Sequence, residues 1–260
     1  MLEQWFTWLP VLGICMMRPL GAMLLLPIFN SGTLGGTLVR NALILMIAIP
    51  AVPVYHDWPT LQLTIGFWNF GWLIMCELAI GLMLGFAAAI PFWAVDMAGF
   101  VIDTMRGASM SNVLNPLLGA QSSIYGILFT QLLSVLFLML GGFNQLITSI
   151  YYSYKTLPPG GGIHFSPSFL SFVSHEWRLM YELCLGFAMP SMVAMLLVDM
   201  ALGLINRSAQ QLNVFFLSMP IKSVMSLLLL IISLNFAFGN YLAKVDAFER
   251  EVGRLLRALS

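Results

Sequence analysis

The feature that most constrains this chain is the length of its apolar runs. One of them, from Ser123 to Tyr151, contains no charged residue. It exceeds the roughly 20 apolar residues that a helix needs to cross the hydrocarbon core of a bilayer. Only helices and closed barrels satisfy their backbone hydrogen bonds internally in hydrocarbon. Because the runs are continuous and do not alternate in polarity, they favour helices over an outer-membrane barrel.

The composition also favours a location in lipid. Only 8% of the residues are charged and 60% are hydrophobic, whereas a soluble domain carries about 25% charged residues. Charged side chains are rarely buried, so a soluble fold of 260 residues would need more of them to cover its surface. The formal net charge is zero, and we therefore expect no basic face and no nucleic-acid partner.

A window of about 20 residues divides the chain into about six hydrophobic segments. They cover approximately residues 5–29, 41–55, 61–95, 123–151, 179–205 and 214–242, and the third is either one tilted helix or a broken pair. Polar connections are predicted over residues 30–40, 96–122 and 155–178, the last of which contains the helix-breaking sequence PPGGG. The predicted fold class is all-α: a polytopic membrane protein of helical hairpins forming one hydrophobic domain, residues 1–240.

The tail, residues 241–260, differs from the rest of the chain. Its apolar residues recur at spacings of three and four, with charged residues between them, which is the pattern of an amphipathic helix. Two interpretations are open: a helix that lies on the membrane surface and a helix that docks on a partner subunit.

Prolines interrupt the apolar runs and predict kinked helices. Each proline removes a backbone donor, which is tolerated at membrane depth where neighbouring protein or a water-lined cavity satisfies the freed groups. We therefore expect broken helices that pack on protein. These prolines are Pro10, Pro19, Pro27, Pro50, Pro53, Pro91, Pro190 and Pro220.

Charged residues also occur in or beside the apolar runs. Each costs about 2.5–3.5 kcal/mol at the centre of a lipid-exposed helix, so each is expected to face protein or water. They could form an ion or proton relay, or salt bridges between helices or subunits. We favour salt bridges because no acidic pair recurs at helical spacing. The charged residues are Arg18, Glu77, Glu182, Asp199, Arg207 and Lys222.

Small residues predict one close contact between helices. Glu77, Gly81 and Gly85 lie four residues apart in the sequence ELAIGLMLG, which places both glycines on one helix face. Such a smooth stripe lets another backbone approach closely. We interpret Gly81 and Gly85 as a packing seam.

The motifs of common enzymes do not occur in the sequence. It contains no H-E-x-x-H, no G-x-S-x-G, no P-loop and no dinucleotide fingerprint. His56, His164 and His175 have no metal-ligand spacing, and the three cysteines form no C-x-x-C pair. We expect no enzymatic activity, no bound metal and no cofactor.

The stretch VIDTMRGASMSNVLNPLLGAQSS, from Val101 to Ser123, is unusually rich in small and hydroxyl residues. Together with LPIFNSG (Leu26–Gly32), ELAIGLMLG and DMALGLINRSAQQLNVF (Asp199–Phe215), it resembles one family of type III secretion export-apparatus subunits. This family is known as SctT or SpaR in injectisomes and FliR in flagella. The NSG and RGA elements are more similar to the injectisome branch, and the resemblance extends from about Leu26 to Lys222.

The resemblance implies a subunit of the export gate, within the secretion basal body of the bacterial inner membrane. Members of this family join SctR- and SctS-like subunits in a helical hetero-oligomer that forms the pore for unfolded protein substrates. A plug loop seals the closed pore, and Val101–Ser123 matches this loop by position. The residues at its centre are Met105, Arg106, Gly107, Ala108, Ser109, Met110, Ser111 and Asn112.

The composition of this loop suits a plug that withdraws for a passing polypeptide. Glycine and serine supply flexibility and small volume, and methionine adapts to varied surfaces. Arg106 could add a salt bridge or a barrier to cations. An alternative function is a small secondary transporter or ion channel in which Glu77, Asp199 and Lys222 form the coupling site.

Overall fold

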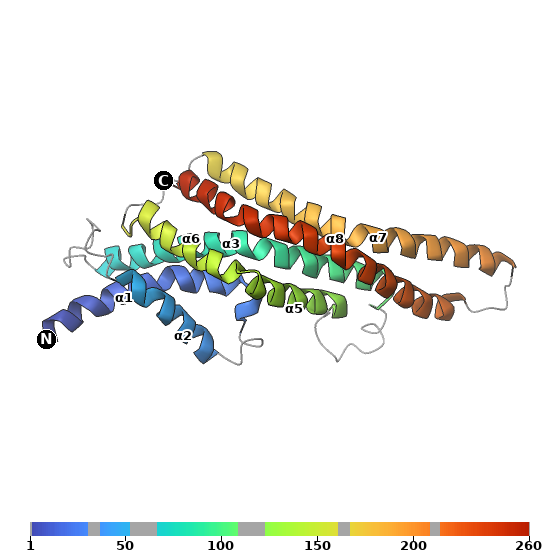
Figure 1. The fold of residues 1–260 in the computed structure, drawn as a ribbon, viewed down its shortest axis with the longest axis horizontal. Helices are drawn as coiled ribbons and strands as arrows, with labels where there is room; N and C mark the ends of the chain where they lie inside the picture. The colour runs from blue at the N-terminus through green and yellow to red at the C-terminus, as the bar shows by residue number, and fades with distance from the viewer. Residues whose placement is uncertain are drawn as a thin grey trace. The chain divides into compact units, whose positions relative to one another are not determined.

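The computed structural model describes residues 2–30, 37–52, 67–108, 123–160, 167–208 and 214–259. Figure 1 shows that helices make up nearly all of this part of the chain, and no strand occurs in it. This confirms the predicted all-α fold class. The elements are α1 (Leu2–Leu25), η1 (Pro27–Phe29), α2 (Thr37–Ala48), α3 (Phe67–Met105), α5 (Ile124–Met139), α6 (Gly142–Thr156), α7 (Pro167–Ser208) and α8 (Val214–Leu259).

Two of the described helices are long and apolar enough to cross a membrane. They are the α3 helix, with a mean hydropathy of 2.3 over its apolar window, and the α7 helix, with 1.9. Helices α5 and α6 would form a third membrane span if the bent pair crosses the membrane as one span. This agrees with a polytopic membrane protein, and α3 is one helix where the sequence left a broken pair open.

The predicted hydrophobic segment over residues 123–151 is not one straight helix. It is divided into α5 and α6, whose axes differ by 68°. The break falls at Gly141, whose φ of +81° lies in the left-handed region that only glycine adopts at no steric cost. A window that averages hydropathy does not detect this break, because both sides of it are equally apolar.

Two of the predicted connections, over residues 96–122 and 155–178, are partly helical in the structure. Helix α3 continues through Met105, although a loop was expected from residue 96 onwards, and α7 begins at Pro167, inside the expected connection 155–178. Some of the polar residues in these stretches are not loop residues but buried residues of a helix. Asp103 and Glu176 are helical and only 6% and 3% exposed.

The chain divides into two compact units. Unit 1 comprises Met1–Ile90, Ser134–Trp177 and Asp246–Ser260, and unit 2 comprises Pro91–Leu133 and Arg178–Val245. The boundary within α3 falls at Pro91, which lies inside that helix. Unit 1 therefore takes residues from the beginning, the middle and the end of the chain.

The tail continues α8 without a break and belongs to unit 1. Its apolar face is buried there, and the buried side chains are Val252, Leu255, Leu256 and Leu259. These residues are part of the periodic set that predicted an amphipathic helix. Their face is covered by unit 1 of this chain itself, an outcome that neither open interpretation of the tail included.

Within unit 1, helices α1 and α3 approach so closely that side chains do not fit between them. A Cβ atom on Gly81 would lie 2.8 Å from the Cα atom of Arg18, and one on Gly85 would lie 2.5 Å from the carbonyl oxygen of Ala22. On the opposite helix, a Cβ atom on Gly21 would lie 2.7 Å from the carbonyl oxygen of Leu78. Close approach of this kind gives backbones extensive van der Waals contact.

We expect Gly81→Ala to destabilise unit 1 by about 1–3 kcal/mol, because the added methyl group meets backbone atoms that cannot move aside. Gly71→Ala is the matched control, since Gly71 lies in the same helix with no atom within 4 Å of its Cβ position. The control should be neutral or stabilising by about 0.5–1 kcal/mol. Isolated membranes that contain the full chain are heated and then extracted with a mild detergent. The measurement is the temperature at which half of the chain is no longer extracted in soluble form. Equal temperatures for the two variants would contradict the seam.

The buried tail predicts that Leu256→Ala lowers the stability of the chain by about 2–5 kcal/mol, as truncation of buried leucines generally does. Arg254→Ala is the control, because Arg254 is exposed and pairs with its helix neighbour Glu251; its expected effect is about 0–1 kcal/mol. Limited proteolysis of the full chain in membranes measures both. Wild-type protease resistance of Leu256→Ala would show that the tail is not packed in unit 1.

Candidate functional site

Arg18 of α1 and Glu77 of α3 form a buried ion pair in unit 1. Their side chains are 0% and 2% exposed. Arg18 Nε donates to Glu77 Oε2 at 2.5 Å, and Nη2 donates to Oε1 at 3.1 Å. Both carboxylate oxygens are therefore engaged in a two-point contact, which is the strongest form of an arginine–carboxylate pair.

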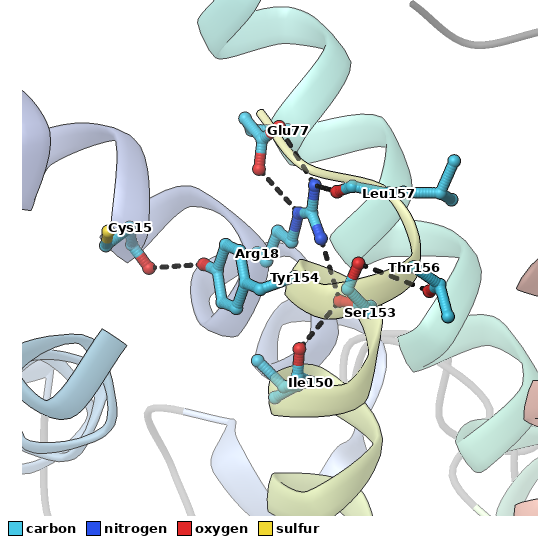
Figure 2. A network of polar contacts seen from close by, with 8 residues as sticks. All are labelled: Cys15, Arg18, Glu77, Ile150, Ser153, Tyr154, Thr156 and Leu157. Atoms are coloured by element: carbon cyan, nitrogen blue, oxygen red, sulfur yellow. Dashed lines mark hydrogen bonds and ion pairs between the residues drawn. The ribbon is translucent and has the colours of Figure 1, made fainter. Parts of the chain in front are cut away.

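The same guanidinium also binds the C-terminal end of α6 (Figure 2). Nη1 donates to the Oγ atom of Ser153 at 2.9 Å, and Nη2 donates to the carbonyl oxygen of Leu157 at 2.5 Å. The guanidinium carbon lies 4.3 Å from the ring centre of Tyr154, within the range of a cation–π contact. Arg18 thus joins three helices, α1, α3 and α6.

Tyr154 connects α6 to α1 a second time. Its hydroxyl group donates to the carbonyl oxygen of Cys15 at 2.8 Å, and the side chain is buried. Cys15 lies one turn before Arg18 on α1. We call Arg18, Glu77, Ser153 and Tyr154 the arginine cluster.

The remaining predicted charges of the apolar runs lie in unit 2. Lys222 of α8 pairs with Asp199 of α7 at 2.6 Å and donates to the carbonyl oxygen of Met105, at the end of α3, at 3.4 Å. Glu182 pairs with Arg178 one turn away on α7 at 2.8 Å. Both of these last side chains are more than half exposed.

Arg207 occupies the last turn of α7 and is exposed. A cation at this position interacts favourably with the negative end of the helix dipole. The predicted role of Arg207 in a salt bridge between helices or subunits stays a prediction.

A second polar cluster, in unit 2, joins the end of α3 to the start of α5. Asp103 is 6% exposed and lies in the last turn of α3. Its Oδ2 atom accepts hydrogen bonds from Ser123 Oγ at 2.7 Å and from the backbone N–H of Tyr125 at 3.1 Å. Its Oδ1 atom pairs with Arg106 Nε at 2.7 Å. We call Asp103, Arg106, Ser123 and Tyr125 the stem cluster.

Ser123 caps the N-terminus of α5. Its Oγ atom accepts from the backbone N–H of Gly126 at 2.8 Å while donating to Asp103. A side-chain oxygen that accepts from the third helical residue is the usual N-cap arrangement. Asp103 satisfies the next free N–H group, at Tyr125, and places a negative charge at the positive end of the helix.

Arg106 and Tyr125 complete the stem cluster. The guanidinium carbon of Arg106 lies 4.3 Å from the ring centre of Tyr125, and the Tyr125 hydroxyl lies 3.2 Å from Ser226 Oγ on α8. Close backbone contact supports the arrangement, since a Cβ atom on Gly99 would lie 2.5 Å from the Cα atom of Gly126. Helices α3, α5 and α8 therefore meet here.

The structure describes only part of the predicted plug. Met105 is the last residue of α3, and Arg106–Ala108 form a turn in which Gly107 adopts a φ of +88°. Ser109, Met110, Ser111 and Asn112 lie outside the described residues. The stem cluster thus marks the two described ends of the connection, at Ala108 and Ser123.

Most partners in these two clusters were not predicted from the sequence. Asp103 carried one signal, its position three residues before Arg106, because such pairs are neighbours on a helix. Ser123 carried another, since a serine directly before an apolar run is a helix N-cap signal. Ser153 and Tyr154 had no comparable signal, because their contacts with Arg18 and Cys15 join residues far apart in sequence.

No group of three or more metal-ligating side chains occurs in the parts of the chain that the structure describes. The sequence matches bacterial export proteins, family 1, over residues 9–247. The chain belongs to this family.

Individual relatives agree with this assignment. The chain is 44% identical to the secretion system apparatus protein SsaT of Salmonella typhimurium over 250 residues, which cover 95% of this chain and 96% of SsaT. It is 35% identical to the Yop proteins translocation protein T of Yersinia pestis over 226 residues, 86% of each chain. It is 28% identical to the flagellar biosynthetic protein FliR of Escherichia coli K12 over 219 residues, 84% of this chain and 82% of FliR.

These identities confirm the predicted SctT/SpaR/FliR family. They are higher with the secretion-system relatives than with this FliR, as expected for the injectisome branch. The family match starts within α1 and ends within α8, so it includes every residue of the arginine and stem clusters.

We expect Arg18→Ala to destabilise the chain by about 3–5 kcal/mol, because it leaves the Glu77 carboxylate buried without its partner. Arg178→Ala is the control for removal of an arginine from an exposed pair and should cost about 0–1 kcal/mol.

The double variant Arg18→Leu with Glu77→Leu should be more stable than Arg18→Ala, because it removes both charges. The measurement is the temperature at which half of the full chain, heated in membranes, is no longer extracted by a mild detergent. It is compared for Arg18→Ala, Arg178→Ala and the double variant. A double variant less stable than the single variant would contradict the assignment of the loss to the unpaired charge.

Proposed function

We propose that this chain is an export-gate subunit of a type III secretion apparatus of the injectisome branch, in the bacterial inner membrane. The observation that carries the proposal is the family match over residues 9–247 together with 44% identity to a secretion system apparatus protein. The apolar helices α3 and α7 support placement in a membrane. In this proposal the subunit helps to form the pore through which unfolded protein substrates pass.

We infer that the partners are SctR- and SctS-like subunits. Helix α7 supports this inference because it carries a row of large apolar side chains, each of which is about half exposed. They are Tyr181, Leu185, Met189, Val193 and Leu197. The exposed Arg178–Glu182 pair is on the same helix, and exposed charges next to apolar residues suit a protein neighbour better than hydrocarbon.

We further propose that the connection between α3 and α5 is the plug of the pore. The described ends of this connection are held together by the stem cluster, as a plug anchored at both ends requires. Gly107, in the turn that follows α3, adopts a φ of +88°, and a glycine in this conformation suits the end of a helix.

The transporter alternative receives less support from the described contacts. Both oxygens of Glu77 are bound by Arg18, and Asp199 is paired with Lys222. A coupling site needs acids that exchange ions or protons during transport. Here each acid already has a cation partner within its own unit.

Co-expression with SctR- and SctS-like subunits should yield one complex whose measured mass contains all three proteins. The assignment as an export-gate subunit predicts that the chain is recovered in this complex and not as a free oligomer. Recovery of the chain alone, with transport of a small solute in liposomes, would overturn it in favour of a transporter.

Deletion of Arg106–Asn112 should make the assembled apparatus leaky to small ions, because it removes the centre of the proposed plug. The measurement is ion flux across the inner membrane of cells that carry the full apparatus, with complex yield as the control for assembly. An unchanged flux at normal complex yield would remove the plug assignment.

A further inference from the structure

Asp96 is an acid of the apolar helix α3 that lacks a cation partner among the described residues. It is exposed in unit 2, and its side chain forms neither an ion pair nor a hydrogen bond with any residue that the structure describes. Other acids of the apolar helices differ from it in this respect. An arginine or a lysine of the same chain pairs with Glu77, Asp103, Glu182 and Asp199.

The carboxylate of Asp96 lies against the backbone of α5. A Cβ atom on Gly126 would lie 2.5 Å from Asp96 Oδ1, so the missing side chain at Gly126 leaves the space that the carboxylate occupies. The backbone N–H of Gly126 already donates to Ser123 Oγ at 2.8 Å. The carboxylate therefore has a defined place on the surface of unit 2, and its oxygens remain available as acceptors.

Large apolar side chains lie near Asp96 on the same two helices. Phe100 lies one turn further along α3, and Ile127 and Leu128 directly follow Gly126 on α5. Each of these three apolar side chains is about half exposed. This part of the surface of unit 2 thus combines exposed apolar side chains with an unpaired carboxylate.

Neither hydrocarbon nor bulk water suits such a surface. A carboxylate in a membrane helix is costly against lipid, whereas exposed apolar side chains that lie together often mark a site of protein contact. A protein partner that presents a cation among apolar side chains satisfies both parts of the surface. Its cation pairs with the carboxylate, and its apolar side chains cover Phe100 and Ile127.

The cations of unit 2 that lie near the end of α3 are already engaged. Arg106 pairs with Asp103 at 2.7 Å, and Lys222 pairs with Asp199 at 2.6 Å. Transfer of either cation to Asp96 would leave another acid without its partner. Charge complementarity therefore favours a cation that comes from another chain.

We propose that Asp96 is a contact point for a neighbouring subunit, through a helix of that subunit that presents a lysine or an arginine among apolar side chains. The cation forms an ion pair with the Asp96 carboxylate, and the flanking apolar side chains contact Phe100 and Ile127. This inference rests on the proposed function of the chain as a subunit of a larger assembly.

Asp96→Asn removes the charge with little change in shape. The variant is co-expressed with the SctR- and SctS-like subunits, and the measurement is the fraction of the chain that is recovered in the complex. We expect this fraction to fall about ten-fold, because removal of one partner of a buried ion pair leaves the other charge unpaired in the interface. A wild-type fraction would overturn the inference.

The chain expressed alone separates a contact between subunits from a contact within the chain. Heated membranes that contain Asp96→Asn should release the chain to a mild detergent up to the wild-type temperature, because Asp96 has no partner among the described residues. Asp103→Asn is the matched comparison: it weakens bonds inside unit 2 and should lower that temperature. A lower temperature for Asp96→Asn would show that Asp96 acts inside the chain and would overturn the inference.

Replacement of Asp96 by a photo-crosslinking amino acid, in cells that carry the full apparatus, locates the partner helix. We expect adducts with another subunit within one helical turn of a lysine or an arginine. The inference fails if the adducts contain lipid alone, if they fall on a segment without such a cation, or if no protein adduct forms at wild-type complex yield.

A charge exchange tests the ion pair itself. Asp96→Lys should prevent assembly, because it places two cations together in the interface. Replacement of the crosslinked lysine or arginine by aspartate in the partner should then restore most of the complex. Assembly of Asp96→Lys at the wild-type level, or no restoration by the exchange, would refute the pair.

The wild-type chain in the same co-expression distinguishes failure of the inference from failure of the proposed function. If the wild-type chain forms no complex with these subunits, the proposed function fails and the inference falls with it. If the wild-type chain and Asp96→Asn enter the complex equally well, the proposed function stands and only the inference fails.

Discussion

Arg18 brings a permanently charged group with five N–H donors into a part of unit 1 that solvent does not reach. Burial of such an ion costs several kcal/mol unless acceptors surround it. The acceptors come from Glu77 on α3 and from Ser153 and Leu157 at the end of α6. The positions of three helices are therefore coupled to one cation, and the glycine seam at Gly81 permits the close approach that the contact needs.

Unit 2 follows the same principle with the signs reversed. There a buried carboxylate, Asp103, accepts hydrogen bonds from a backbone N–H group at a helix N-terminus and from a hydroxyl group, and it forms an ion pair with a guanidinium. In both units buried ions help to fix the positions of helices, since apolar side chains gain little by choosing one apolar neighbour over another in a membrane. The difference lies in position: Arg18 binds helix interiors and a helix end, whereas Asp103 lies where the chain leaves one helix and enters the next.

The fold class and one close helix face could be predicted from the sequence. The bends of the helices and the contacts between distant residues could not. Long apolar runs led to helices, and the spacing of Glu77, Gly81 and Gly85 led to a close helix face, because both are local properties. The bend at Gly141 and the helical state of Asp103 were not predictable from polarity, which is the same for a loop residue and a buried polar residue. The contact from Arg18 to Ser153 joins residues 135 positions apart, and no local pattern encodes it.

The discontinuity of unit 1 has a consequence for the order in which the protein matures. Its last stretch, Asp246–Ser260, leaves the ribosome after the helices that it covers, and synthesis of the intervening chain takes on the order of ten seconds. During that interval the site for Leu255 and Leu256 on unit 1 is uncovered. A polypeptide that stops before this stretch therefore leaves an apolar surface of unit 1 without its cover.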